Sequence, residues 1–551
     1  MLPPEVEDQH YQQYLATSWK ARWDSFGSEP LYSKHIMDKG FSDAVVVLPG
    51  WKLPPEQLTN STRSFFDRTG FEDEAANLIA LARIRPDRLQ FNPKLYTAYG
   101  GAYFLILGVW IGLLSAFTPV VIRPSLSYYL AHIDKMAWLF LAGRLLAAAA
   151  YVLSALLTYK IGTRHWGKKA GLWAGLFFAA APGNIFLTHL MKPGPVGFLG
   201  LIGVFFFCAE ILDGRSERAT WLKAGACLGL AAGATNYLWD GGMLFIVTLW
   251  LRARWQKADW RRDFLFSVQA VAAALAIYFL TNLFLIIEYK TAWRSMMRSG
   301  EHASRQMIEV WNWALFGFPK VVTPPVAALV LAGLLAKNNR SDPKRFLAMF
   351  GFVYYVCLAW MGQGGKQLMS IRHFPATFLA CLLAGCLISD WTKPAVSRWK
   401  AKLALAAAVA ALGYACLMSA VLDFNYHLES VGRSTKEVSG DWIEREIPAG
   451  NELGFLRLPQ PSNAPYFHWN RYRLSFIEDH VMEADPPFEA LPQYLVLTAY
   501  DHDPRILLKP LLDKRYVSVK RFEPFSFWGI GHSLGEDLAN PLIEIYRRKP
   551  A

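Results

Sequence analysis

Runs of about twenty apolar residues recur along this chain, and each is long enough to cross a bilayer of about 30 Å as a helix. This feature restricts the fold more than any other. The runs predict helices, with boundaries good to a few residues, at 98–121, 136–158, 170–188, 195–212, 221–236, 238–252, 265–288, 317–336, 346–362, 373–389 and 402–423. The sequence therefore predicts a mainly α, polytopic helical membrane protein.

The composition agrees with this class. Of the 551 residues, 53% are hydrophobic and 18% are charged, which is too apolar for one soluble domain. The net charge of +13 is explained by Lys and Arg in cytoplasmic loops, so no nucleic-acid partner is expected. The cysteines lie inside apolar segments and are interpreted as small hydrophobic residues rather than as disulfides or metal ligands: Cys208, Cys227, Cys357, Cys381, Cys386 and Cys416.

Polar regions flank the apolar part. We expect an extracytoplasmic N-terminal region at 1–97, a transmembrane domain at 98–423 and a small extracytoplasmic α/β domain at 424–551. The last region is Pro-rich and has short strand-like runs, 494–497 and 542–546, between loops. The first residues, MLPPEVEDQH, lack the apolar core of a cleavable signal. Export of such a polar start predicts an upstream spanning helix; otherwise the topology differs from the one given below.

Charge predicts the orientation, because cytoplasmic loops collect Lys and Arg. Five short loops are rich in these residues: Lys160/Arg164/Lys168/Lys169, Arg215/Arg218/Lys223, Arg252/Arg254/Lys257/Arg261/Arg262, Lys337/Arg340/Lys344/Arg345 and Lys393/Arg398/Lys400/Lys402. If these loops are cytoplasmic, the connections between them and the C-terminal domain lie outside. Both ends of 98–121 then also lie outside, which predicts a re-entrant or interfacial helix there.

An acidic pair, Asp73 and Glu74, begins a helix-like run on this outer side, within the polar and aromatic stretch 63–103. Two acids just outside a membrane are suited to act as a general base or to hold a cation. The alternative is a plain surface helix, because acids at a helix start favour the helix dipole.

The stretch FEDEAANLIALARIRPDRLQFNPKLYTAYGGAY (71–103) resembles the Asp-Glu loop of bacterial family 39 glycosyltransferases, whose fold is called GT-C. Further similar stretches follow in the same order: 143–193, GLAAGATNY (229–237), IRHFPATFLA (371–380) and DWIEREIPAGNELGF (441–455). The resemblance implies an integral-membrane, inverting hexosyl- or pentosyltransferase in the bacterial inner membrane. It would transfer a sugar from a polyprenyl phosphate to a lipid, glycan or protein acceptor on the extracytoplasmic side.

The resemblance also implies roles for the acidic pair, with Asp73 as the catalytic base or acceptor-orienting carboxylate and Glu74 beside it. The sequence departs from the family in two ways. Family members have a spanning helix before this loop, and no such helix is expected within residues 1–97, as if the first transmembrane helix were missing. Family members also carry an acid after the histidine that matches His189, where HLMKPG places Gly194. Asp240 is one candidate to replace that acid.

Glycosyl transfer needs a carboxylate near the acceptor and cations near the departing phosphate. The candidate phosphate-binding residues are Lys192, Arg372, Lys366 and Lys290 from the predicted outer loops. The candidate substrate-binding residues are Asn92, Lys94, Tyr99, His189 and Asp240. Each has a structural alternative: Arg372 as an interfacial arginine, and His189 as a hydrogen-bonded helix cap. The sequence names no cofactor, and a requirement for a divalent cation stays open.

Two other functions compete with this enzyme. A transporter or flippase of lipid-linked sugars would favour internal repeats and broken helices near the bilayer midplane. No clear repeat is visible, although the Gly-rich stretch 224–242 interrupts one helix pair. A catalytically inactive GT-C scaffold is the other alternative, and Gly194 and the absent first helix favour it.

Overall fold

The computed structural model describes residues 72–84, 88, 90–93, 99–123, 133–287, 289–290, 317–361, 373–455, 464–467, 471–476, 491–498, 502–527 and 540–550. The chain divides into two compact units. The helical unit comprises 77–120 and 139–420, and the second unit includes 421–551. The predicted domain limits at 97/98 and 423/424 stay predictions.

Helices account for most of the described residues up to 430. In order they are α4 (Glu72–Arg83), α5 (Gly101–Phe117), α7 (Ile133–Trp166), α8 (Lys168–Ala179), α9 (Pro182–Thr188), α10 (Gly194–Leu212), α11 (Arg218–Ala234), η3 (Asn236–Gly242), α12 (Met243–Trp255), α13 (Trp260–Thr281), α14 (Leu283–Ile287), α17 (Phe318–Val322), α18 (Pro324–Leu334), η5 (Lys337–Arg340), α19 (Pro343–Met361), α20 (His373–Trp391) and α21 (Arg398–Ser430). Every predicted apolar segment coincides with one or more of these helices, which confirms the mainly α class.

Several helices are suited to a bilayer by length and composition. Among the described residues, five are long and apolar enough to cross a membrane, at 135–166, 194–212, 260–281, 373–391 and 398–428. A sixth span results if α8 and α9, which meet at a bend of 55°, are counted together. Leu, Val and Phe side chains stay exposed along these helices, as expected for surfaces that face lipid. The chain is an integral membrane protein.

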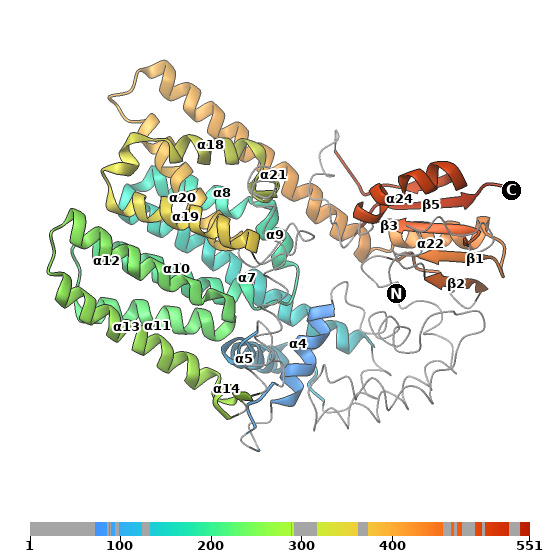
Figure 1. Cartoon of the computed structure of the whole chain (residues 1–551), viewed down its shortest axis with the longest axis horizontal. Helices are drawn as coiled ribbons and strands as arrows, with labels where there is room; N and C mark the ends of the chain where they lie inside the picture. The colour runs from blue at the N-terminus through green and yellow to red at the C-terminus, as the bar shows by residue number, and fades with distance from the viewer. Residues whose placement is uncertain are drawn as a thin grey trace. The chain divides into compact units, whose positions relative to one another are not determined.

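Small residues allow α10, α11 and α13 to approach closely (Figure 1). Glycines recur every fourth residue on α11, and a Cβ atom added at Gly225 would lie 2.0 Å from the carbonyl oxygen of Ala270 on α13. At Gly229 the added Cβ would lie 2.5 Å from the carbonyl oxygen of Ala274. In lipid, where water cannot drive helices together, such close backbone contact is a main source of helix association.

Helix α5 connects helices at one end of the unit. The Gly101 amide donates to Asn282 Oδ1 beyond the last residue of α13, at 2.7 Å. Nine residues later, Trp110 Nε1 donates to the carbonyl of Ala142 on α7, at 2.8 Å. Ala142 is also close to that end, because the neighbouring Gly143 packs against Met191 of the turn between α9 and α10. The interfacial or re-entrant course expected for 98–121 stays a prediction.

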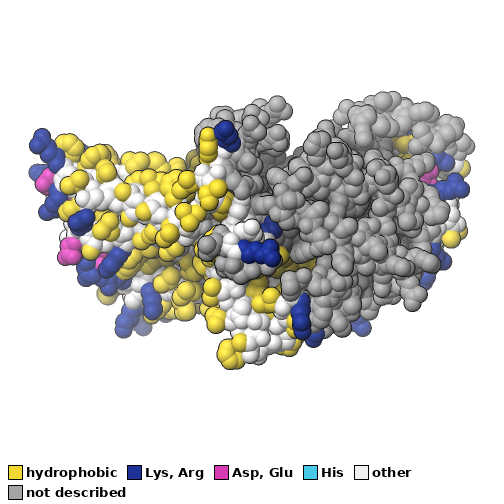
Figure 2. Space-filling model, turned by 90° about the horizontal axis from the view of Figure 1, so that it is seen from below, with side chains coloured by type: hydrophobic (Ala, Val, Ile, Leu, Met, Phe, Trp, Pro, Cys, Tyr) yellow, Lys and Arg dark blue, Asp and Glu magenta, His cyan; other side chains and the backbone are white. Residues whose placement is uncertain are grey.

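The five basic loops meet at the opposite end of the unit, named here the basic-loop end. Contacts between carboxylates and cations join them: Arg164 and Arg215 to Glu210, Lys344 and His165 to Asp213, Arg252 to Asp263, and Arg345 and Lys393 to Asp390. Figure 2 shows Lys and Arg gathered at one end of the helical unit, with hydrophobic side chains beyond them. The prediction from the charge pattern that the five basic loops lie on the same side is therefore confirmed.

The C-terminal part forms a five-stranded mixed sheet in the order β2-β1-β3-β5-β4. Its strands are β1 (Glu452–Phe455), β2 (Arg473–Phe476), β3 (Tyr494–Thr498), β4 (Tyr516–Phe522) and β5 (Ile543–Arg548). Strands β2, β1 and β3 are parallel, whereas β5 is antiparallel to both β3 and β4. Helices α22 (Thr435–Glu446) and α24 (His502–Arg515) complete the predicted small α/β domain.

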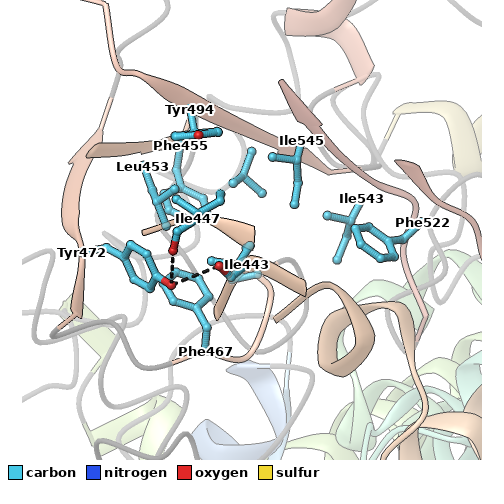
Figure 3. Packing of buried hydrophobic residues seen from close by; sticks show 12 residues of the cluster. Ile443, Ile447, Leu453, Phe455, Phe467, Tyr472, Tyr494, Phe522, Ile543 and Ile545 are labelled. Atoms are coloured by element: carbon cyan, nitrogen blue, oxygen red, sulfur yellow. Dashed lines mark hydrogen bonds between the residues drawn. The ribbon is translucent and has the colours of Figure 1, made fainter. Parts of the chain in front are cut away.

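Strand β3 explains why this sheet carries a helix on each face. Tyr494 and Val496 pack into a cluster with Ile443 of α22, whereas Leu495 and Leu497 pack with Leu511 and Leu512 of α24. Successive strand residues point to opposite faces, so five buried residues in a row require cover on both sides. Figure 3 shows the α22 side, where Tyr472 Oη donates to the carbonyls of Ile443 and Ile447.

The end of α21 is tied to this domain through Asn425. Its Nδ2 donates to the carbonyl of Phe525 at 3.1 Å, and its Oδ1 accepts from the Phe525 amide at 3.0 Å. Asn540 Nδ2 also donates to Asn425 Oδ1 at 2.6 Å. The Thr435 amide, at the start of α22, in turn donates to Asn540 Oδ1 at 2.5 Å. Two asparagines thus join the last residues of α21 to the C-terminal domain within the second unit.

Candidate functional site

Helix α4 carries the predicted acidic pair in its first turn. Asp73 is the second residue of the helix and Glu74 the third. Acids in this position interact favourably with the unpaired amides and positive dipole end of a helix. Glu74 is fully buried, so it differs from the exposed acid that a plain surface helix would carry. The side-chain position of Asp73 lies outside the described residues.

From Asn77 onward, α4 is fastened to the helical unit. Asn77 is buried and its Nδ2 donates to the carbonyl of Met191 at 2.7 Å. One turn later, Leu81 approaches Gly108 of α5, where an added Cβ would lie 3.2 Å from Leu81 Cδ1. Met191 in turn fills the space beside Gly143 of α7. The acidic helix therefore packs beside the turn 189–193.

That turn contains two predicted site residues. His189 ends α9, and its Nδ1 lies 2.9 Å from the carbonyl oxygen of Ile185, so the ring is a hydrogen-bonded capping group. Lys192 is half-buried, and its amide donates to the carbonyl of Leu190 at 2.9 Å. Pro193 follows and α10 begins at Gly194, the position where the resemblance led us to expect an acid. Lys192 thus lies in a short, well-defined connection.

The short helix η3 carries Asp240 and is held by two tyrosines. Tyr355 of α19, which is fully buried, donates from its hydroxyl to Asp240 Oδ1 at 3.2 Å. Tyr278 of α13 donates to Asn236 Oδ1 at 3.0 Å and packs its ring edge-on against Trp239. These contacts orient η3 from two different helices.

Tyr99 lies beside the start of η3. It forms an isolated antiparallel bridge with Thr235, and the next amide, Gly100, donates to the carbonyl of Ala234 at 3.0 Å. An added Cβ at Gly100 would lie 2.1 Å from the carbonyl oxygen of Gly233, so only glycine permits this approach. The aromatic and Gly-rich entry that the sequence singled out is therefore a docking segment for α11.

The first turn of α10 brings these parts to one end. A Cβ added at Gly197 would lie 3.0 Å from Leu238 Cδ1 and 3.1 Å from Thr235 Cγ2. The turn 189–193 enters α10 directly before this contact, and η3 lies directly against it. We call this region, comprising α4 from Asn77, the turn 189–193, η3 and Tyr99, the α4 end. It lies opposite the basic-loop end along α10.

The remaining predicted residues have varied positions. Lys290 is exposed, three residues after α14, and its Nζ lies 6.0 Å from the centre of the Tyr289 ring. Asn92 is half-buried in an extended segment. Lys94, Lys366 and Arg372 lie outside the described residues. The structure thus brings Lys192, Tyr99, His189 and Asp240 to the α4 end and leaves the other phosphate-binding candidates as predictions.

One group of side chains among the described residues has the composition of a metal site, but it lies at the basic-loop end. His165, Glu210 and Asp213 offer ligand atoms within 4.8 Å of one another. The carboxylates of this group already face cations: Glu210 faces Arg164 and Arg215, and Asp213 faces Lys344. Burial acts to raise the pKa of Asp213, but hydrogen bonds with Lys344 and His165 outweigh it and hold that pKa below its ordinary value. This arrangement matches a structural ion-pair network.

Sequence reasoning missed Asn77 and Tyr355. Asn77 follows Glu74 by three residues, and that spacing places both on one face of a helix, a signal that was available. Tyr355 lies in an aromatic run that is typical of a buried helix, and only the packing of η3 against α19 reveals its role.

No family model and no curated protein matches the sequence. Among solved structures, ArnT from Cupriavidus metallidurans in the apo state is similar at 13% identity and a TM-score of 0.46, over 86% of this chain and 93% of that one. The oligosaccharyltransferase AglB from Archaeoglobus fulgidus, in complex with an inhibitory peptide and a dolichol-phosphate, gives 11% identity, a TM-score of 0.44 and coverage of 83% and 70%.

The arabinofuranosyltransferase AftD from Mycobacteria gives 12% identity and a TM-score of 0.37, over 87% of this chain and 39% of that one. These proteins are glycosyltransferases of the GT-C type, the type that the sequence motifs resemble. At such identities and scores, the activity of this chain has to be argued from its own residues.

Proposed function

We propose that this chain is an integral-membrane glycosyltransferase that moves a sugar from a polyprenyl-phosphate donor to a lipid, glycan or protein acceptor. The observation that supports it most is the hydrogen bond from Asn77 to the Met191 carbonyl. It fastens the acidic helix beside the turn that carries Lys192, and that turn enters α10 next to η3. The part of α4 from Asn77 onward, the turn with Lys192 and the helix η3 with Asp240 thus lie at one end of the helical unit, which supports the proposal.

The chemistry of the reaction suits these groups. Positive charge develops on the sugar ring as the bond to phosphate breaks, and the phosphate leaves as an anion. Asp73 would remove the proton of the acceptor hydroxyl, with Glu74 beside it. Lys192 and Arg372, with Lys366 and Lys290, would stabilise the phosphate through charge-assisted hydrogen bonds. The anomeric configuration would invert, because the acceptor attacks opposite the leaving phosphate.

Asp240 is the second acid in this proposal. Gly194 opens α10, and η3 packs against the same first turn through Leu238. The Tyr355 hydroxyl holds one carboxylate oxygen and so restricts the rotation of Asp240. With Asn92, Lys94, Tyr99 and His189, Asp240 would orient the acceptor or the sugar. A divalent cation could share this role, and the requirement for one is part of the test.

The charge pattern supports an extracytoplasmic site. The five basic loops meet at the end opposite η3 and the turn 189–193. If the positive end is cytoplasmic, the α4 end faces outward, where a polyprenyl-linked sugar of the bacterial inner membrane is used. The C-terminal α/β domain would lie on the same outer side.

One observation favours a transporter of lipid-linked sugars. The α8–α9 pair is a broken span with a bend of 55°, and broken helices are common in transporters. A transporter would move the donor lipid across the membrane without breaking its sugar–phosphate bond. An inactive scaffold would do neither.

Reconstituted vesicles separate these functions. The purified chain is placed in vesicles with a polyprenyl phosphate that carries a radiolabelled sugar, and candidate acceptors are added with and without EDTA. We expect label to pass to the acceptor with release of polyprenyl phosphate. Movement of intact donor between leaflets, without transfer, would support the transporter, and absence of both would support the scaffold. Loss of transfer with EDTA and its return with added Mg²⁺ or Mn²⁺ would identify a cation requirement.

A further inference from the structure

Two interrupted helices lie side by side in the helical unit. The first interruption separates α8 from α9 at 180–181, and the second separates α17 from α18 at Thr323. Gly183 of α9 lies directly against Val321 of α17, since an added Cβ would be 2.6 Å from Val321 Cγ1. Thr323 has φ of 82°, a conformation that is unfavourable for a β-branched residue. The interruptions are therefore adjacent, and one of them is strained.

The carbonyl groups released at the first interruption have partners. Tyr151 Oη donates to the carbonyls of Phe178 and Ala179 at 2.7 and 3.1 Å. Ser419 Oγ donates to the carbonyl of Ala180 at 3.0 Å. In a membrane each such carbonyl would otherwise carry a large desolvation cost. Because these oxygens already accept hydrogen bonds, they are poor ligands for a cation.

Three buried polar side chains near the interruptions make no hydrogen bond within the described part of the chain. They are Asn184, through both Nδ2 and Oδ1, Thr323 through Oγ1 and Thr377 through Oγ1. Their exposed fractions are 0%, 1% and 0%. Leaving a buried amide without any partner is costly, so native proteins supply one. Asn184 needs an acceptor for its amide hydrogens and a donor for its oxygen.

The third of these residues, Thr377, lies on α20. On α20, Gly385 packs against α8 and Leu383 packs against Gly333 of α18. At about 100° per residue, Thr377 lies about 80° from the first and, in the opposite direction, about 120° from the second. Leu379, which meets Gly351 of α19, points to the opposite side of the helix. Both α9 and α17 also contact α20. Thr377 thus lies on the face of α20 turned away from α19, on a helix that both interrupted helices contact.

Aromatic side chains surround this region, and Lys320 of α17 is a cation on one of the interrupted helices. Phe374, one turn before Thr377, packs against Tyr151 and Phe198. Helices α9, α17 and α18 contain no Asp or Glu, and neither does α20 before Asp390. A metal ion would find no compensating charge on these helices. The groups present fit a small neutral molecule that both donates and accepts hydrogen bonds.

We propose that Asn184, Thr323 and Thr377 bind ordered water between the two interrupted helices, inside the membrane-spanning unit. Water satisfies both ends of the amide and the two hydroxyls, as buried waters with about three hydrogen bonds do in other proteins. Asn184 lies on α9, which leads into the turn that carries His189 and Lys192. The water site is independent of the proposed glycosyl transfer.

Thermal unfolding of the full chain in detergent gives the first test. If Thr377 binds water, Thr377→Val removes a hydrogen bond without changing the shape, and the unfolding midpoint falls by a few degrees. If the hydroxyl is buried dry, the same change removes an unsatisfied group, and the midpoint stays or rises, which overturns the proposal. Thr158→Val calibrates the loss of a hydroxyl that bonds within its own helix, to Ser154 at 2.8 Å.

Hydroxyl-radical footprinting of the unaltered chain gives a second test that does not depend on a variant folding. Radicals formed by X-rays from bound water oxidise aromatic side chains beside it. Phe374 and Phe205 are both nearly inaccessible, at 1% and 0%, but only Phe374 lies one turn from Thr377. We expect Phe374 to be oxidised well above Phe205, and less so in Asn184→Leu. Equal oxidation of the two rings in the unaltered chain would overturn the proposal.

Discussion

At the basic-loop end, buried carboxylates pair with arginines, as Asp263 does with Arg252, whereas at the α4 end tyrosine hydroxyls donate to Asp240 and to Asn236. Asp263, for example, is bonded by Arg252 and Ser216, and Arg252 also donates to the carbonyl of Ile211 at 2.9 Å. Such closed networks hold helices together and leave little freedom for chemistry. We therefore expect the ion pairs of the basic-loop end to maintain the structure, and we propose the α4 end as the place where substrate binds.

The largest expected effect comes from Asp73→Asn, which should abolish transfer while donor binding is kept. The change removes a charge and preserves the shape, and loss of a general base typically costs about 10²–10⁴ in rate. Single-turnover transfer and equilibrium binding of the donor lipid measure the two properties. Glu74→Gln should cost less in rate if Glu74 only orients its neighbour. Its full burial also predicts a lower unfolding temperature.

Full activity of Asp73→Asn would move the search for the base to Glu74 or Asp240. Arg372→Ala serves as the complementary variant, because its proposed partner is the phosphate. It should weaken donor binding more than it slows the transfer step. Active enzyme in all three single variants, at Asp73, Glu74 and Arg372, would reject the acidic-loop model.

At the basic-loop end, Asp263→Ala is expected to lower stability rather than the rate of transfer. Asp263 is 1% exposed and Arg252 is 6% exposed, so the change leaves a buried arginine without its carboxylate. Breaking a buried pair on one side costs about 3–5 kcal/mol. We expect a clear fall in the unfolding temperature, whereas the donor KM of the protein that remains folded stays unchanged. Glu217→Ala, which removes an exposed acid from the same region, is the matched control.

If Asp263→Ala were as stable as its control, the network would not be structural. A variant that folded normally but had lost donor binding would contradict the comparison more directly. It would show that the basic-loop end also takes part in binding.

A smaller effect is expected for Tyr355→Phe at the α4 end. The variant keeps the buried ring and removes only the hydroxyl that donates to Asp240. If Tyr355 positions Asp240, kcat or KM should change several-fold with little loss of stability, because one hydrogen bond contributes about 1 kcal/mol. Tyr278→Phe, which removes the bond to Asn236, tests whether the effect is specific to the acid. Equal kinetics for Tyr355→Phe and the unaltered chain would remove Asp240 from the proposed site.

The sequence predicted the helices and the basic-loop end better than it predicted the α4 end. Apolar runs and basic clusters specified the helices and the meeting of the five loops, because bilayer thickness and charge asymmetry are direct physical constraints. Strands β3 and β5 also lie where the strand-like runs 494–497 and 542–546 predicted them. These features depend on local pattern alone.

The α4 end depends on contacts between distant residues, which pattern cannot reveal. Asn77 and Met191 are 114 positions apart, and Tyr355 and Asp240 are 115 apart. The predicted outer loops supplied Asp240 and Lys192 as candidates, but the sequence did not show that the first turn of α10 lies between them. Position 323 is a threonine and not a glycine, so the sequence did not predict the positive φ at this interruption.

The smallest expected effect concerns the pH dependence of stability at the basic-loop end. Asp213 has a lowered pKa, because the hydrogen bonds with Lys344 and His165 outweigh its burial. A carboxyl with a lowered pKa stabilises the folded state above its unfolded pKa, about 3.9. That contribution is lost as the pH falls through the lower folded value. The comparison is between the unaltered chain and Asp213→Asn.

Unfolding temperatures of both proteins in detergent, measured from pH 6 to pH 3, test this ion pair. The unaltered chain should be slightly more stable at pH 6, because Asn keeps the shape of Asp213 but loses the charge that faces Lys344. The difference should shrink below about pH 4, where the carboxyl takes up its proton. A partly exposed pair contributes little, so the expected gap is small. A gap that widened in acid would mean that Asp213 is held as the neutral acid, contrary to the ion-paired network assigned to this end.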